Sequence, residues 1–300
     1  SVDVASGVRV SNFKLDFDFF PNPQHSIKFG THYTYHKLSP NIANATNGEE
    51  TFSNNLDPKY ALETGTYIED DWKLSQQLSV NYGVRFSTFT QMGPYVSPID
   101  STVFGKNDAA ITYTGFEPRI SARYKLSAAA SVKGGITVTN QYLHLVSNST
   151  STLPADVWVP SSQRIRPQRG IQYALGYFQN LKDNTYETSI EVYYKDLDIQ
   201  IDYRENFVNN AADDIEQEFV FGRGWSYGAE FYVNKRKGAL TGWIGYTLSR
   251  TEREFPDINN GEVFPAVFDR RHDLSVVANY QIHPKWELGG AFVYGAGQAY

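Results

Sequence analysis

The stretch YIEDDWKLSQQLSVNYGVRF, from Tyr67 to Phe86, decides the fold. Apolar residues occupy every second position from Leu78 to Phe86, and polar or small residues stand between them. A side-chain period of two is typical of a strand with one apolar and one polar face. The link before it, Lys73 to Gln77, is short and polar, as in a tight turn. The stretch therefore predicts an amphipathic strand that follows a tight turn.

The same alternation recurs along the whole chain of 300 residues. About twelve segments show it, each near the ~10 residues with which a tilted strand crosses a bilayer. The polar faces of these strands would line the interior of a barrel. The charged residues expected on that inner face are Lys14, Asp16, Asp18, Arg85, Arg123, Lys125, Glu187, Glu191, Lys195 and Glu230.

Short and long connections alternate in strict order between these segments. Outer-membrane barrels have short periplasmic turns and long external loops, whereas a soluble sandwich has no reason to place every long loop at one end. The order therefore predicts an all-β, transmembrane, antiparallel up-and-down β-barrel. The short links are 21–25, 73–77, 127–131, 182–185, 235–239 and 283–285. The long links are 39–59, 90–115, 147–168, 204–224 and 252–271.

The composition narrows the class of protein further. The mean hydropathy is −0.45, and no run approaches the ~20 apolar residues of a membrane-spanning helix. The absence of cysteine excludes disulfide scaffolds and thiolate metal sites. The net charge of −6 argues against a nucleic-acid partner, which requires a basic surface. Aromatic rings near strand ends are expected at the lipid headgroups. They are Trp72, Tyr82, Tyr124 and Trp286.

Four parts of the sequence resemble the TonB-dependent outer-membrane receptors. The resemblance is to the large receptors of Bacteroidetes that carry a carboxypeptidase-regulatory-like leader domain. The stretch from Tyr67 to Phe86 is similar to the family's hairpin with an aspartate, an aromatic residue and a Gly-x-Arg strand. The other parts are FEPRISARYKLS (116–127), GRGWSYGAEFYVNK (222–235), and GWIGYTLSRTE (242–252) with FDRRHDLSVVANY (268–280).

The resemblance implies a function as well as a fold. Family barrels have about twenty-two strands, so residues 1–300 are expected to be a partial barrel without plug domain, TonB box or terminal strands. The implied function is energised import through the bacterial outer membrane, in which a TonB complex pulls on the plug. The inner-face charges would then hydrogen-bond the plug. Implied partners are outer-membrane lipid, a small-molecule, glycan or peptide cargo, and, as in some receptors of this type, a surface lipoprotein cap.

Cargo contacts are predicted in the long connections. Aromatic rings and arginines at one rim can stack on or pair with a cargo, although the same side chains could serve only to order the loop. The predicted residues are Tyr142, His144, Trp158, Arg164 and Arg166.

Metal sites are not predicted. His32 and His36 share the polar face of one strand, but a rise of ~3.3 Å per residue separates them by ~13 Å. An acidic group in one long connection could bind Ca²⁺, but a solvated loop explains it better. Its members are Asp213, Asp214, Glu216 and Glu218.

Catalysis and cofactors are not predicted either. A nucleophile elbow would show as G-x-S-x-G between a strand and a helix, whereas Ser226 lies inside an alternating strand. A barrel-embedded enzyme is therefore disfavoured. A passive porin and a soluble β-rich adhesin or carbohydrate-binding module stay open on the sequence alone.

Overall fold

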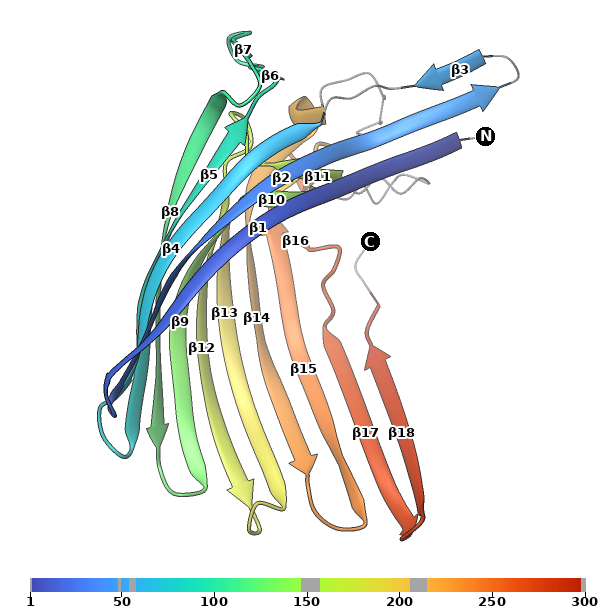
Figure 1. Ribbon diagram of the computed structural model, residues 1–300. Coiled ribbons are helices and arrows are strands. Elements are labelled where there is room, and N and C mark those ends of the chain that lie inside the picture. Colours follow the sequence, from blue (N-terminus) through green and yellow to red (C-terminus); the bar gives the residue numbers. More distant parts are fainter. Residues whose placement is uncertain (1, 48–49, 54–57, 147–156, 206–214, 298–300) are drawn as a thin grey trace.

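One long antiparallel sheet dominates the computed structural model (Figure 1). The structure describes residues 2–47, 50–53, 58–146, 157–205 and 215–297. Twelve strands follow one another in this sheet in chain order, and each pairs with the next strand of that path. The predicted all-β, up-and-down antiparallel fold is confirmed. No helix in the described ranges has the length and apolar character needed to cross a membrane.

Most strands of the path are longer than the ~10 residues that a bilayer requires. They are β1 (Val2–Asn22), β2 (His25–Asn47), β4 (Lys59–Lys73), β5 (Leu78–Met92), β8 (Ala109–Lys125), β9 (Ala130–Gln141), β12 (Gln168–Leu181), β13 (Tyr186–Tyr203), β14 (Phe219–Lys235), β15 (Leu240–Glu254), β17 (His272–His283) and β18 (Trp286–Gly295). The long connections contain β3 (Glu50–Ser53), β6 (Tyr95–Val96), β7 (Val103–Phe104), β10 (Leu143–Val146), β11 (Val157–Pro160), β16 (Phe264–Pro265) and the 3₁₀ turns η1 (Ile215–Glu218) and η2 (Asn259–Gly261).

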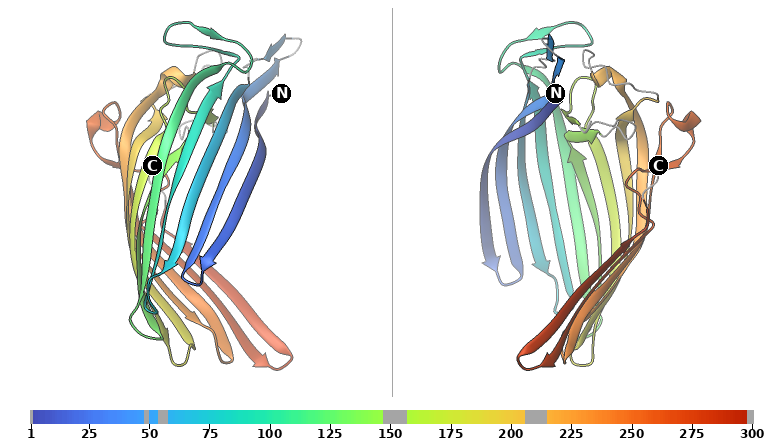
Figure 2. Two further views of the ribbon diagram at one scale, coloured as in Figure 1. Left: turned by 60° about the vertical axis from the view of Figure 1, so that its left-hand side comes forward. Right: turned by 90° about the vertical axis from the view of Figure 1, so that its right-hand side faces the viewer.

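The predicted short turns all lie at one end of the sheet and the long connections at the other (Figures 1 and 2). Several predicted boundaries are wrong, because β2 continues to Asn47, β8 begins at Ala109 and β14 begins at Phe219, all inside segments expected to be loops. The backbone ladder simply continues there, with Met92 opposite Ala109 and Tyr203 opposite Phe219. Alternation fades beyond the bilayer, because neither face of the sheet must remain apolar there.

The two faces of the sheet differ as the alternation predicts. Apolar side chains such as Phe116, Ile136 and Ile190 stay exposed on one face. The strand registers place all ten charged residues expected inside on the opposite face; for example, Arg85 lies across from Glu117. The sheet curves so that one face is concave (Figure 2). The β10–β11 hairpin lies within this curve, and Tyr142, directly before β10, is hydrogen-bonded to Ser87 on the polar face, so the polar face is the inner one.

Neighbouring residues of β9 provide a test of the two faces. We expect Ile136→Arg, near the middle of the strand on the apolar face, to lower the free energy of unfolding in bilayers by ~2–4 kcal/mol, because the charge enters hydrocarbon. Thr137→Arg, one residue later on the polar face, should change it by no more than about 0.5 kcal/mol. Chemical unfolding of the protein in lipid vesicles measures both values. Equal losses would show that the faces are assigned wrongly.

Candidate functional site

The connection between β9 and β12 folds back into the concave side of the sheet (Figures 1 and 2). We call its described residues, 142–146 and 157–168, the inward hairpin. Its strands β10 and β11 pair with each other, with Leu143 opposite Pro160. The hairpin contacts both β2 and β13, which are far apart in the order of the sheet. It therefore crosses the enclosed space at the end of the long connections, which we call the external mouth.

Tyr142 anchors the start of the inward hairpin to the wall. Its side chain is buried, and its ring stacks on Phe89 with 5.1 Å between centroids. Its hydroxyl lies 2.7 Å from the Ser87 hydroxyl, which in turn donates to Glu117 at 2.7 Å. Since Ser87 has one proton to donate, Tyr142 is the donor to Ser87. Gly115 leaves the necessary room, because a Cβ there would lie 2.5 Å from the Tyr142 hydroxyl.

A second apolar cluster fixes the body of the inward hairpin. Side chains from both of its halves pack against the mouth ends of β13 and β14, and all members are buried. Burial of such side chains is worth ~1.5–3 kcal/mol each, which is ample to hold a short hairpin in place. The cluster consists of Val146, Val159, Ile165, Ile201, Tyr203 and Phe219.

His144 is enclosed within the inward hairpin. Only 1% of its surface is exposed, and its Nε2 lies 3.0 Å from the Ser161 hydroxyl. Its Nδ1 has no hydrogen-bond partner among the described residues. Burial lowers the pKa of His144 to about 4, because a charged ring would lose its hydration there. The ring is therefore neutral at physiological pH.

The five predicted cargo residues do not share one surface. Tyr142 and His144 face the packed side, whereas Trp158 is 44% exposed. Arg166 is also exposed, and Arg164 donates to the Pro98 carbonyl of the β6–β7 connection at 3.3 Å. Trp158 and Arg166 are thus the exposed members of the group, whereas Tyr142, His144 and Arg164 make contacts that order the hairpin. Their role in cargo contact stays a prediction.

A charged network lies on the inner wall beside this hairpin. The Glu63 carboxylate is 3.7 Å from Nε2 of His32 and 3.4 Å from Nε2 of His36. It also accepts a hydrogen bond from Arg85 at 3.2 Å. The two histidines thus meet through an acidic residue of the neighbouring strand, which the spacing along one strand could not reveal. No arrangement of three or more His, Asp or Glu residues in the described part of the chain fits a metal ion.

The acidic group in the β13–β14 connection is only partly described. Asp213 and Asp214 lie outside the described residues. Glu216 is 3% exposed and ion-paired, so the expectation of a solvated loop is wrong for this residue. No local pattern signals this burial, because the partners of Glu216 lie more than fifty positions away.

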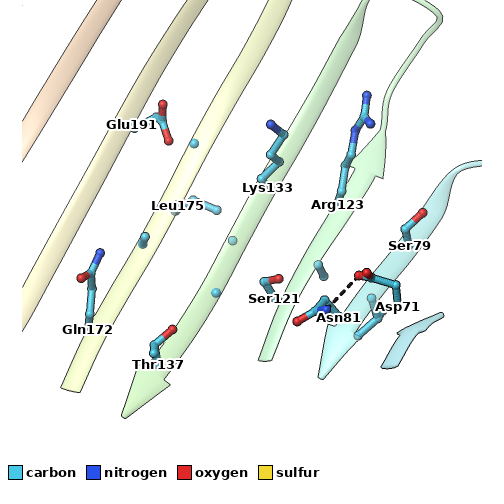
Figure 3. Close-up of a pocket in the computed structure, with 16 residues that line it drawn as sticks. Asp71, Ser79, Asn81, Ser121, Arg123, Lys133, Thr137, Gln172, Leu175 and Glu191 are labelled. Carbon is cyan, nitrogen blue, oxygen red and sulfur yellow. Dashed lines mark hydrogen bonds between the residues drawn. The ribbon is translucent and has the colours of Figure 1, made fainter. Parts of the chain in front are cut away.

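Below the network, toward the short turns, the inner wall has a depression of about 450 Å³ (Figure 3). Gly135, Ala174 and Gly176 contribute no long side chains to its floor. Figure 3 shows Lys133 between Glu191 on one side and Arg123 on the other. Small residues thus form the floor of this depression, and charges of both signs surround it.

Comparison with known protein families shows to which family this chain belongs. Residues 4–300 match the family described as TonB dependent receptor-like, beta-barrel. The chain belongs to the TonB-dependent receptors. As in that family, the barrel resides in the bacterial outer membrane. The predicted membership of the TonB-dependent receptors and the predicted location are confirmed.

Solved structures of receptor barrels share this fold at low identity. The FrpB iron transporter from Neisseria meningitidis is 14% identical, with a TM-score of 0.66 over 95% of this chain and 42% of its own. The ferric yersiniabactin uptake receptor FyuA from Yersinia pestis is 16% identical, with a TM-score of 0.64 over 97% and 42%. The copper transporter OprC is 10% identical, with a TM-score of 0.66 over 97% and 45%.

This receptor chain therefore spans less than half the length of each of these structures. A sequence search of curated proteins finds no match.

Gly115 offers a test of the first anchor. We expect Gly115→Ala to displace Tyr142, because the new methyl group would lie 2.5–2.6 Å from three polar atoms, including the Tyr142 and Ser87 hydroxyls. Amide exchange in residues 142–146 should then become at least about tenfold faster, as expected for the loss of a net hydrogen bond and a ring contact. Gly290→Ala, where a Cβ meets nothing within 4 Å, is the control. Unchanged protection would mean that Tyr142 does not hold the hairpin.

His144 predicts a pH dependence of the same hairpin. Its pKa rises from about 4 in the packed hairpin to about 6.5 when the hairpin is released. Acid therefore favours release, and packing is fully stable only above the higher value. Amide protection in residues 143–146, corrected for intrinsic exchange, should fall roughly twentyfold between about pH 7 and about pH 5. His144→Gln should lose this dependence, and a wild-type profile without slope would contradict the assignment.

Proposed function

We propose that this chain is part of the wall and external face of a receptor that imports a nutrient or metal chelate by TonB-driven transport. The observation that carries the proposal is the inward hairpin, which lies across the external mouth and is fixed to a polar inner wall. A receptor needs a defined surface at its entrance, and a hairpin fixed across the mouth provides one. The family membership supports the same conclusion.

A metal chelate is the first cargo class to test. The three related structures are named an iron transporter, a ferric yersiniabactin uptake receptor and a copper transporter. The exposed Trp158 ring can stack on a flat or aromatic cargo, and Arg166 can pair with its anionic groups. Glycans and peptides are the further classes, since stacking on tryptophan suits a sugar ring as well.

The proposed mechanism uses both regions of the site. Cargo first binds at the external mouth, against the exposed side of the inward hairpin. A plug, belonging to a part of the protein outside these residues, packs against the inner wall and seats a segment in the depression lined by Gly135 and Gly176. The TonB complex then pulls on the plug, and a path opens along the wall. The strands themselves stay paired, because any unpaired backbone group in hydrocarbon would cost several kcal/mol.

Several further features belong to the same proposal. Residues 1–300 form part of a barrel of about twenty-two strands, and a leader domain of the Bacteroidetes type and a surface lipoprotein cap complete the receptor. The proposal contains no enzymatic step. Ser226, the serine weighed as a nucleophile, lies 3.0 Å from the Thr251 hydroxyl on the next strand, which is not a general base.

Two exposed tryptophans allow a test of the proposal, with Trp158 as the site of the test variant and Trp286 as the site of its control. A strain that lacks the receptor should fail to grow on one member of a panel of limiting iron chelates, cobalamin, glycans and peptides. Trp158→Ala should raise the half-saturating concentration of that nutrient about five- to tenfold, the expected loss of one aromatic contact. Trp286→Ala, 73% exposed near a short turn, should have no effect. Uptake that persists without TonB would favour a passive pore instead.

A further inference from the structure

Glu216 is a buried carboxylate at the point where three long connections meet. It lies in η1, just before β14, and is 3% exposed. Lys59, the first residue of β4, forms an ion pair with its Oε1. Ser162, which follows β11, donates a hydrogen bond to its Oε2 at 2.6 Å. Each carboxylate oxygen therefore binds a different connection.

These bonds cross the external mouth. β4 and β14 are separated in the sheet by β5, β8, β9, β12 and β13. An ion pair between residues adjoining strands so far apart cannot run along the sheet. It runs through the concave space instead, where the inward hairpin lies between the two sides.

Ser162 connects Glu216 to the inward hairpin. Its hydroxyl accepts hydrogen bonds from the backbone N–H groups of Arg164 and Ile165, each at 3.2 Å. Its carbonyl accepts a hydrogen bond from the Tyr113 hydroxyl of β8 at 2.8 Å. The turn around Ser162 is thus tied to the wall at β8 and, through Glu216, to both sides of the mouth.

The charge of Glu216 is essential to this arrangement. Burying a carboxylate without a partner is costly, so the bonds from Lys59 and Ser162 stabilise Glu216 in its enclosed position. Ion pairs on exposed surfaces differ in this respect. Arg223 and Glu254 join adjacent strands on an exposed surface, where a pair contributes little.

We propose that Glu216 is a positioning residue that holds the inward hairpin across the external mouth and so sets how far the mouth opens to cargo. This role rests on the proposed function, but its test needs neither cargo nor TonB. Ala61 provides the reporter, because it is fully buried against Phe89 and Tyr142 under the hairpin. A cysteine there can react with a reagent from outside only when the hairpin moves away.

The experiment measures how fast Ala61→Cys reacts with a membrane-impermeant maleimide in the full-length protein in outer membranes. Adding Glu216→Gln or Lys59→Met should raise the rate about tenfold, the effect of losing one charge-assisted contact. Exchanging the charges, Lys59→Glu with Glu216→Lys, should restore most of the slow rate. Glu254→Gln is the matched control and should leave the rate unchanged.

Two results would overturn the proposal. One is a rate within about twofold of the parent in both single variants, a change too small for a lost contact. The other is a raised rate that the charge exchange does not reduce, because a general loosening of the loop would not depend on the pair. A heat-dependent shift in electrophoretic mobility verifies that each barrel is folded. If Glu216→Gln does not fold, Ser162→Ala, which removes only the hydroxyl, takes its place with the same expected increase.

Discussion

Backbone hydrogen bonding in a medium without water is the constraint on which the rest of this structure depends. Every N–H and C=O group of a membrane-crossing strand must pair with a neighbouring strand. Within the path from β1 to β18, the ten strands between these two edge strands meet this demand by pairing on both sides, and the ladder continues into the turns. Lys125 N–H bonds to the Gln77 carbonyl, and Arg236 N–H to the Thr185 carbonyl, so adjacent turns are bonded to each other. With the backbone satisfied in this way, the side chains are free to differ between the two faces.

Strand pairing also explains how charged residues of the inner face find partners. Register places residues from neighbouring strands side by side, and charges that are distant in sequence become partners. Arg85 lies across from Glu117 and also contacts Glu63, so one guanidinium joins acidic groups of two other strands. Such pairs suit the interior because they remain in a polar space. On the outer face the same residues would be exposed to lipid, at a cost of several kcal/mol each near the bilayer centre.

The sequence alone is enough to predict the strands of the barrel wall, but it is not enough to predict the structure at the external mouth. Alternation from Leu78 to Phe86 is a local property, and it assigns each side chain to a face without knowledge of the partner strand. The inward hairpin has no such local signal. It depends on contacts such as Tyr142 with Ser87 and Ser162 with Glu216, whose members are more than fifty positions apart. A glycine in a strand often marks a close approach of another segment, but Gly115 gave no such signal because the sequence placed it in the long link 90–115.

Anchoring the hairpin at both ends has a consequence for any molecule that enters. A loop that orders itself only on contact with a ligand loses conformational entropy at that moment, which weakens binding. In this chain the hairpin is already fixed during folding, through the Phe89 stack at one end and the Glu216 carboxylate at the other. Trp158 is therefore presented on a surface that is preorganised rather than adaptable. In the receptor proposed above, such a surface would favour cargoes of one shape over many loosely related ones, and that selectivity would follow from the same burial that encloses Tyr142 and His144.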